Sequence, residues 1–118
     1  MTTQDEKANR LAELQVTHYK TLRDLDLVQS AMRSNRSAIE NFPERWAQQV
    51  EQLKEQLADE TADREALLLS WSETLQTRAE EFNELLTESE RLQIQEKIVV
   101  KMTVELDQQI AALNEELR

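Results

Sequence analysis

Apolar residues recur at alternating intervals of three and four residues between Leu11 and Phe42. The series also contains polar members at His18, Thr21 and Asn35. In order, it reads Leu11, Leu14, His18, Thr21, Leu25, Val28, Met32, Asn35, Ile39 and Phe42. Spacing of this kind is typical of a helix that packs lengthwise along a seam. The pattern predicts a first helix over about residues 5–40.

The stretch Asn-Phe-Pro-Glu at 41–44 contains the only proline of a chain that has no glycine. Proline disfavours helical geometry in the residue before it, so Phe42 is expected to leave the helix. Pro43 and Glu44 suit the first turn of a following helix, and Asn41 can accept a hydrogen bond from an early amide. A tight reversal is therefore predicted here.

A second helix is predicted over 44–86. Its series runs Trp46, Val50, Leu53 and Leu57, then Arg64, Leu67, Leu68, Trp71, Leu75, Ala79, Phe82 and Leu86. The series is weak at Ala-Asp-Glu-Thr-Ala-Asp (58–63), where small and polar residues leave the helix free to loosen or break. Beyond Trp71 the spacing drifts to 4-4-3-4, which locally relaxes a left-handed supercoil.

A third helix is predicted over 88–118. Thr87 and Glu90 fit a capping box, which predicts a second reversal. The alternative is that the helix continues, because no glycine or proline stops it. The apolar face is Leu92, Val99, Met102, Leu106, Ile110, Leu113 and Leu117, with Ile98 widening it. Residues 100–106 also alternate as an edge strand would, but a lone strand has no partner here, so a helix is favoured.

These elements predict an all-α fold, in which three long antiparallel helices form an elongated bundle or coiled coil. Residues 1–118 are expected to form a single helical domain. The composition agrees, since 39% of the residues are hydrophobic and 32% are charged. A narrow apolar seam with a large wetted surface has this balance.

The net charge of −10 disfavours direct binding to nucleic acid or to an anionic membrane, because both require clustered lysine and arginine. The absence of cysteine excludes disulfides and thiolate chemistry. No apolar run approaches the roughly 20 residues of a membrane-spanning helix, and the first ten residues lack the apolar core of a signal peptide. A soluble, cytoplasmic protein is expected.

The sequence offers little for catalysis. His18 is the only histidine, and its seam position favours a role in setting register or oligomeric state over a role as base or ligand. The paired carboxylates fall outside the seam and are expected to face water. No enzymatic activity, metal or cofactor is therefore predicted.

The candidate interaction residues form two groups. The polar or aromatic seam residues His18, Asn35, Trp46 and Trp71 are predicted to specify an oligomer seam. Outside the seam, the predicted contacts with a partner are Leu69, Val100, Val104, Arg33 and Arg36. Val100 and Val104 are four residues apart and form a second, smaller stripe, while the two arginines form a basic spot.

The favoured function is a non-enzymatic coiled-coil interaction module, acting as an adaptor or assembly subunit that binds a partner helix. Homo-oligomerisation is expected. Two alternatives remain open at this point: a small acidic chaperone that masks a helical client, and an acidic inhibitor that mimics nucleic acid.

Overall fold

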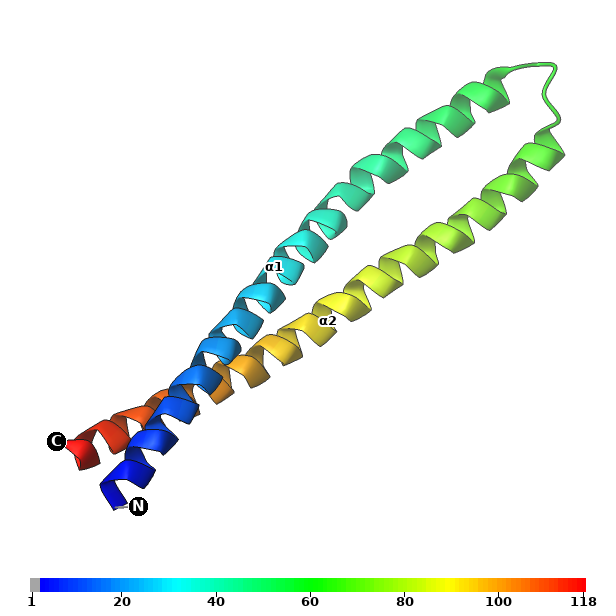
Figure 1. Ribbon diagram of the computed structural model, residues 1–118. Coiled ribbons are helices and arrows are strands. Elements are labelled where there is room, and N and C mark those ends of the chain that lie inside the picture. The colour runs from blue at the N-terminus through cyan, green and yellow to red at the C-terminus, as the bar shows by residue number, and fades with distance from the viewer. Residues whose placement is uncertain (1–2) are drawn as a thin grey trace. The chain divides into compact units, whose positions relative to one another are not determined.

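The computed structural model describes residues 3–118 and contains two long helices. Helix α1 spans Thr3–Ala58 and helix α2 spans Arg64–Leu117, and residues 59–63 connect them (Figure 1). The described residues contain no strand, so the all-α prediction is confirmed and the strand alternative for 100–106 is excluded. The prediction of three helices is wrong, because α1 and α2 together account for all the helical residues that the structure describes.

The chain divides into two compact units, and each unit pairs a part of α1 with a part of α2. Unit 1 consists of residues 1–32 and 91–118, and unit 2 consists of residues 33–90. In each unit the two helices run antiparallel, because residues further along α1 contact residues that come earlier in α2. Unit 1 has the pairs His18–Asp107 and Gln29–Glu96, and unit 2 has Phe42–Phe82 and Trp46–Trp71. That the chain forms a single domain stays a prediction.

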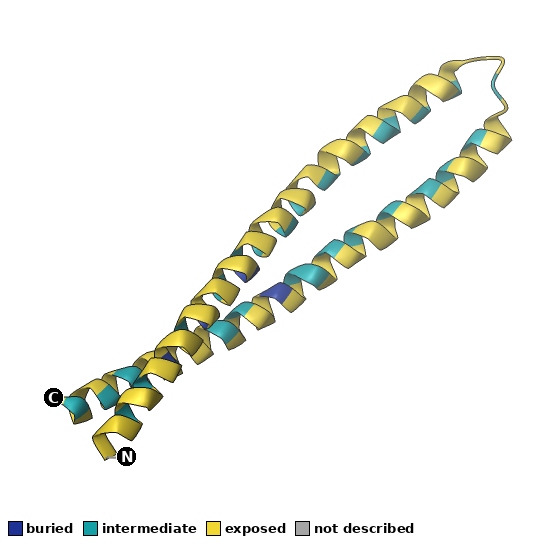
Figure 2. Cartoon of the chain, viewed as in Figure 1, coloured by how far each residue is buried: buried dark blue, intermediate teal, exposed yellow. Residues whose placement is uncertain are grey.

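The best-buried side chains all belong to unit 1. They are Leu14, Thr21 and Val28 on α1 and Leu92 on α2, each no more than 6% exposed (Figure 2). The three α1 residues are spaced seven apart, at positions where the sequence pattern predicts the seam. A buried leucine or valine contributes about 1.5–3 kcal/mol relative to an exposed one. Thr21 satisfies its hydroxyl within α1, by donating to the Thr17 carbonyl at 2.8 Å.

The predicted reversal at 41–44 is absent, because Pro43 lies inside α1. Proline lacks the amide hydrogen that would bond to the carbonyl four residues earlier, on Ile39, and its ring crowds that carbonyl. The helix nevertheless continues, since side chains on both sides of Pro43 pack against α2: Phe42 contacts Phe82, and Trp46 contacts Trp71. Pairing with α2 therefore outweighs the local preference to end the helix.

The predicted reversal at 87–90 is also absent, and α2 passes through Thr87 and Glu90 without a break. The residues that face α1 keep three- and four-residue spacing across this stretch: Leu85, Ser89 and Leu92 are all at least partly covered. A polar residue, Ser89, occupies the inward position between two leucines. The apolar pattern is therefore interrupted at a place where the helix continues.

Within residues 3–118 the chain reverses only at 59–63, inside the stretch 58–63 where the predicted seam is weak. Asp59 Oδ1 accepts hydrogen bonds from the amide and the hydroxyl of Thr61, at 3.0 and 2.7 Å. These hydrogen bonds lower the pKa of Asp59 from its ordinary value of 3.8, and the one from the Thr61 amide contributes more than the one from the hydroxyl. Asp63 caps α2, since its Oδ1 accepts from the Ala66 amide, and Arg64 donates to the Leu57 carbonyl at the end of α1.

Candidate interaction surfaces

Two polar residues of the predicted seam connect α1 to α2 within the chain. In unit 1, His18 Nε2 lies 2.8 Å from Asp107 Oδ1, which makes an ion pair when the imidazole is protonated. The geometry of this contact is not that of a hydrogen bond, so the buried Nε2 of His18 has no hydrogen-bond partner and meets Asp107 through charge alone. In unit 2, the Asn35 side-chain amide donates to the Leu85 carbonyl at 3.2 Å. Both side chains therefore tie the helices together at fixed points.

The two tryptophans of the predicted seam stack on each other in unit 2. The rings of Trp46 and Trp71 have centroids 5.1 Å apart and an interplanar angle of 28°. Phe42 and Phe82 form a second pair at 4.8 Å. All four side chains are only partly covered, and no residue of 33–90 is fully buried. Unit 2 thus owes its helix pairing to aromatic contacts rather than to a closed aliphatic core.

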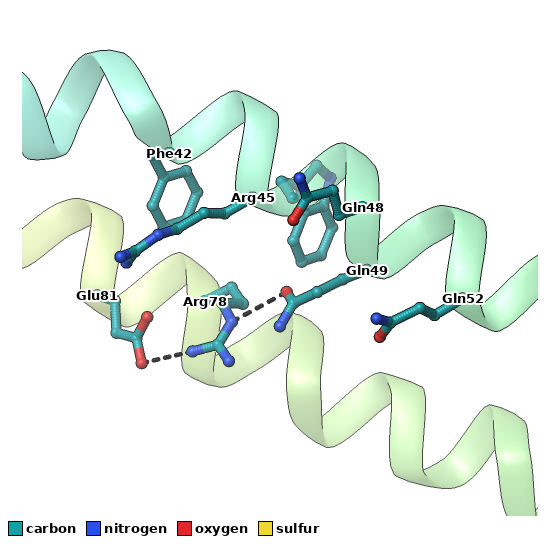
Figure 3. A pocket seen from close by; sticks show the side chains of 8 residues that line it. Phe42, Arg45, Gln48, Gln49, Gln52, Arg78 and Glu81 are labelled. Carbon is teal, nitrogen blue, oxygen red and sulfur yellow. Dashed lines mark hydrogen bonds and ion pairs between the residues drawn. The ribbon is translucent and has the colours of Figure 1, made fainter.

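A cavity of about 450 Å³ lies beside these aromatic rings. Figure 3 shows its polar wall, where Arg78 reaches from α2 towards α1. Arg78 Nε donates to Gln49 Oε1 at 3.0 Å, and its Nη1 donates to Glu81 Oε1 at 2.6 Å. The Arg78 guanidinium is already engaged on two sides, and Arg45 adds a second positive charge to the lining, so the cavity is a polar gap in the helix pairing.

A neighbouring hollow of about 310 Å³ has walls that expose only apolar atoms. It is lined by Phe42, Pro43, Trp46, Leu75, Arg78, Ala79 and Phe82. Pro43 contributes its ring to this surface from within α1. The hollow can accept an apolar side chain, but it contains no group that would orient a substrate.

The large apolar side chains that the described residues expose are concentrated in unit 1. Nine of them lie there, and four lie in unit 2. Those in unit 1 are Val16, Tyr19, Leu22, Leu27, Ile94, Ile98, Val100, Met102 and Val104. Those in unit 2 are Leu68, Leu69, Leu75 and Leu86. Unit 1 therefore combines the best-packed seam with the most apolar surface.

The residues predicted to contact a partner are all exposed. Leu69 is 66% exposed and belongs to unit 2, as do Arg33 and Arg36. Val100 and Val104 belong to unit 1. The structure consequently assigns the predicted contacts to two separate units, and only Val100 and Val104 share an apolar stripe.

One face of unit 1 combines this stripe with apolar residues of α1. Besides the His18–Asp107 pair, the Gln29 side-chain amide donates to Glu96 Oε2 at 3.5 Å. The interval between His18 and Gln29 on α1 equals the interval between Glu96 and Asp107 on α2. Both contacts therefore belong to one register of the two helices.

In this register Leu22, which follows His18 by one turn, lies opposite the valine stripe. Val100 comes one turn after Glu96, and Val104 comes one turn before Asp107, so both valines share a face with these two acids. Leu22, Tyr19 and Gln29 also line a shallow hollow of about 340 Å³ on α1. We call Tyr19, Leu22, Val100 and Val104 the valine face.

A second exposed group was only partly recognised from the sequence. Ile94, Ile98 and Met102 are spaced four apart on α2 and are 60%, 55% and 46% exposed. Met102 was predicted to face the seam, but Thr103 occupies the inward position instead. Ile98 and Val100 are two residues apart, which separates them by about 200° around the helix. The isoleucines therefore lie on the flank of α2 opposite the valine face.

Among residues 3–118, no group of three or more histidine, cysteine, aspartate or glutamate side chains is arranged to hold a metal ion. Over the same residues, neither helix includes a segment that is apolar enough to cross a membrane. Comparison of the chain with known protein families, with curated proteins and with solved structures gave no match. The fold class that the structure defines is an antiparallel pair of long helices.

Proposed function

We propose that this protein is a non-enzymatic helical interaction module, and that its valine face binds a helix of a partner protein. The observation that supports this function is the position of Leu22 opposite Val100 and Val104. Together they form an apolar strip over two helices, and water covers it in the isolated chain.

A partner helix fits this strip for a geometric reason. Two parallel or antiparallel helices leave a groove between them, and an amphipathic helix fills such a groove with residues spaced three and four apart. Tyr19 adds an aromatic ring with a polar hydroxyl, a side chain that is enriched at interface hot spots. Charged groups flank the strip on both helices, because Asp26 lines the hollow on α1 and Asp107 pairs with His18.

The test begins with a photo-crosslinking residue at Val104, in cells of the native source, and with the same residue at Leu27 as the control. Leu27 is 63% exposed but lies away from the valine face. Mass spectrometry of the crosslinked products identifies a protein that is captured only from position 104. Equal capture from both positions, or none from position 104, contradicts the proposal.

Binding of the purified partner is then measured with Leu22→Glu and Val104→Glu, and with Leu27→Glu as the matched control. A charge placed at the centre of an apolar contact is expected to weaken binding by at least about tenfold. The control is expected to bind within about twofold of the natural protein. Circular dichroism checks that all three variants keep their helix content, since all three positions are exposed.

A further inference from the structure

The flank of α2 opposite the valine face carries a second apolar strip with a charge at each end. It consists of Arg91, Ile94, Ile98, Met102 and Glu105, all exposed and all in unit 1. We call these five residues the isoleucine ridge. They span residues 91–105, or about 21 Å of helix. Nothing in the proposed function uses them.

The ridge has the same spacing in both directions. Its intervals are three, four, four and three residues, with Ile98 at the centre. Turning the helix end over end about Ile98 therefore exchanges Ile94 with Met102. The same rotation exchanges Arg91 with Glu105, each seven residues, or two helical turns, from the centre. A second copy of the ridge, running antiparallel, meets the first with apolar side chains opposite apolar ones.

The charges at the ends of the ridge are complementary in that arrangement. Arg91 of each copy lies opposite Glu105 of the other, so two ion pairs of opposite polarity enclose the apolar contact. Arg91 already donates to Gln95 along its own helix, and the pairing depends only on the position of its charge. An isologous interface requires this kind of self-complementarity, in which residue i meets residue j and j meets i.

The local charge also favours a second copy. The whole chain carries a net charge of −10, and two such chains repel each other over most of their surfaces. Segment 91–105 is different, because its three basic residues, Arg91, Lys97 and Lys101, exceed its two acidic residues, Glu96 and Glu105. Contact through this segment therefore avoids the repulsion that the rest of the chain imposes.

The surface area of the chain is compatible with a dimer. The accessible surface is 9120 Å². A compact monomer of 13.8 kDa exposes about 6,600 Å². The difference of about 2,500 Å² exceeds the roughly 800 Å² per partner that a standard interface buries. Because the ridge and the valine face lie on opposite flanks of α2, a second copy on the ridge leaves the valine face open.

We propose that two copies of this chain associate through the isoleucine ridge, with their α2 helices antiparallel and a two-fold axis at Ile98. The contact joins Ile98 to its symmetry mate, Ile94 to Met102 of the other copy, and Arg91 to Glu105. The surface differs from the valine face, so each proposal stands or falls on its own experiment.

Cysteine crosslinking tests the geometry directly, because the natural chain has no cysteine. Ile98→Cys is expected to oxidise to a disulfide-linked dimer, since the two-fold axis places each sulfur next to its mate. Ile94→Cys and Met102→Cys, each alone, are expected to form no disulfide between copies under the same oxidant. A mixture of these two variants is expected to yield the crosslinked heterodimer. Efficient self-crosslinking of Ile94→Cys would instead indicate parallel helices and would overturn the proposal.

Charge reversal tests the ends of the ridge by sedimentation equilibrium at low salt. Arg91→Glu and Glu105→Arg each place like charges opposite each other twice, so each is expected to raise the dimer Kd about tenfold or more. Combining both substitutions is expected to restore Kd to within about threefold. Lys20→Glu makes the same change of charge at an exposed position of α1 outside the ridge; it is the control and is expected to leave Kd unchanged.

Three results would overturn the proposal: a natural chain that stays monomeric up to millimolar concentration, a double reversal that does not recover association, or equal effects of Lys20→Glu and Arg91→Glu. Loss of the dimer together with retained binding of a partner helix at the valine face would remove this inference and leave the proposed function intact.

Discussion

At the scale of single residues, the fold changes the acidity of Asp59, whose pKa is lowered from its ordinary value. Its carboxylate accepts two hydrogen bonds from Thr61 and lies fully in solvent. Hydrogen bonds to the charged form favour ionisation, so the folded-state pKa falls below the value of the unfolded chain. The turn is therefore stabilised above the ordinary aspartate pKa, and this stabilisation is lost as the pH falls through the lowered value.

Replacing Thr61 by valine tests this account. The variant keeps the amide donor and removes the hydroxyl, so the pKa of Asp59 is expected to rise towards 3.8 without reaching it. Carboxyl NMR titration measures the change, and Asp63 is the control because its partner, the Ala66 amide, is untouched. A pKa of Asp59 that does not move would show that the hydroxyl contributes nothing.

At the scale of the helices, the continuity of α1 through Pro43 has a measurable cost. The proline removes one backbone hydrogen bond and strains the preceding turn, while the aromatic pairs on either side keep the helix in place. Pro43→Ala restores the amide donor for the Ile39 carbonyl and improves helix propensity. The free energy of unfolding is expected to rise by about 1–3 kcal/mol.

Urea denaturation measures this difference, and Ser37→Ala on the same helix is the control. Ser37 is exposed, and its replacement removes only the 3.5 Å hydrogen bond that the Asn41 amide donates to its hydroxyl, so stability is expected to change by about 0.5 kcal/mol or less. If Pro43→Ala were neutral or destabilising, the helix would end near residue 42, as the sequence pattern alone suggests.

At the scale of the whole molecule, the sequence predicted an all-α chain and most of the α1 seam, but it predicted one helix too many and misplaced the chain reversal. Local signals at Pro43 and Thr87 each favour a helix boundary, and both are overridden by packing with the opposite helix. The inward positions of α2 include polar residues, among them Thr74, Arg78 and Thr103, so the apolar spacing drifted away from the actual seam. The inward positions of such a helix can be assigned only when its pairing with the opposite helix is known.

The candidate surfaces were predictable to a smaller extent. Val100 and Val104 stood out because they share a stripe outside the seam, and both are exposed. Leu22 and Tyr19 could not be assigned to the same face, since their position depends on the register that His18 and Gln29 set with α2. The isoleucine ridge was hidden because Met102 and Ile98 were assigned to the seam. Ile98 and Val100 are only two residues apart in the sequence, yet they lie on opposite flanks of α2.

The arrangement of two helices with a single reversal is tested most directly by NMR backbone chemical shifts of Cα and Cβ along the chain. The structure predicts continuous helical shifts through residues 41–46 and 86–90, with one interruption at 59–63. Interruptions at 41–44 and 86–88, together with helical shifts through 59–63, would contradict it and restore the arrangement of three helices.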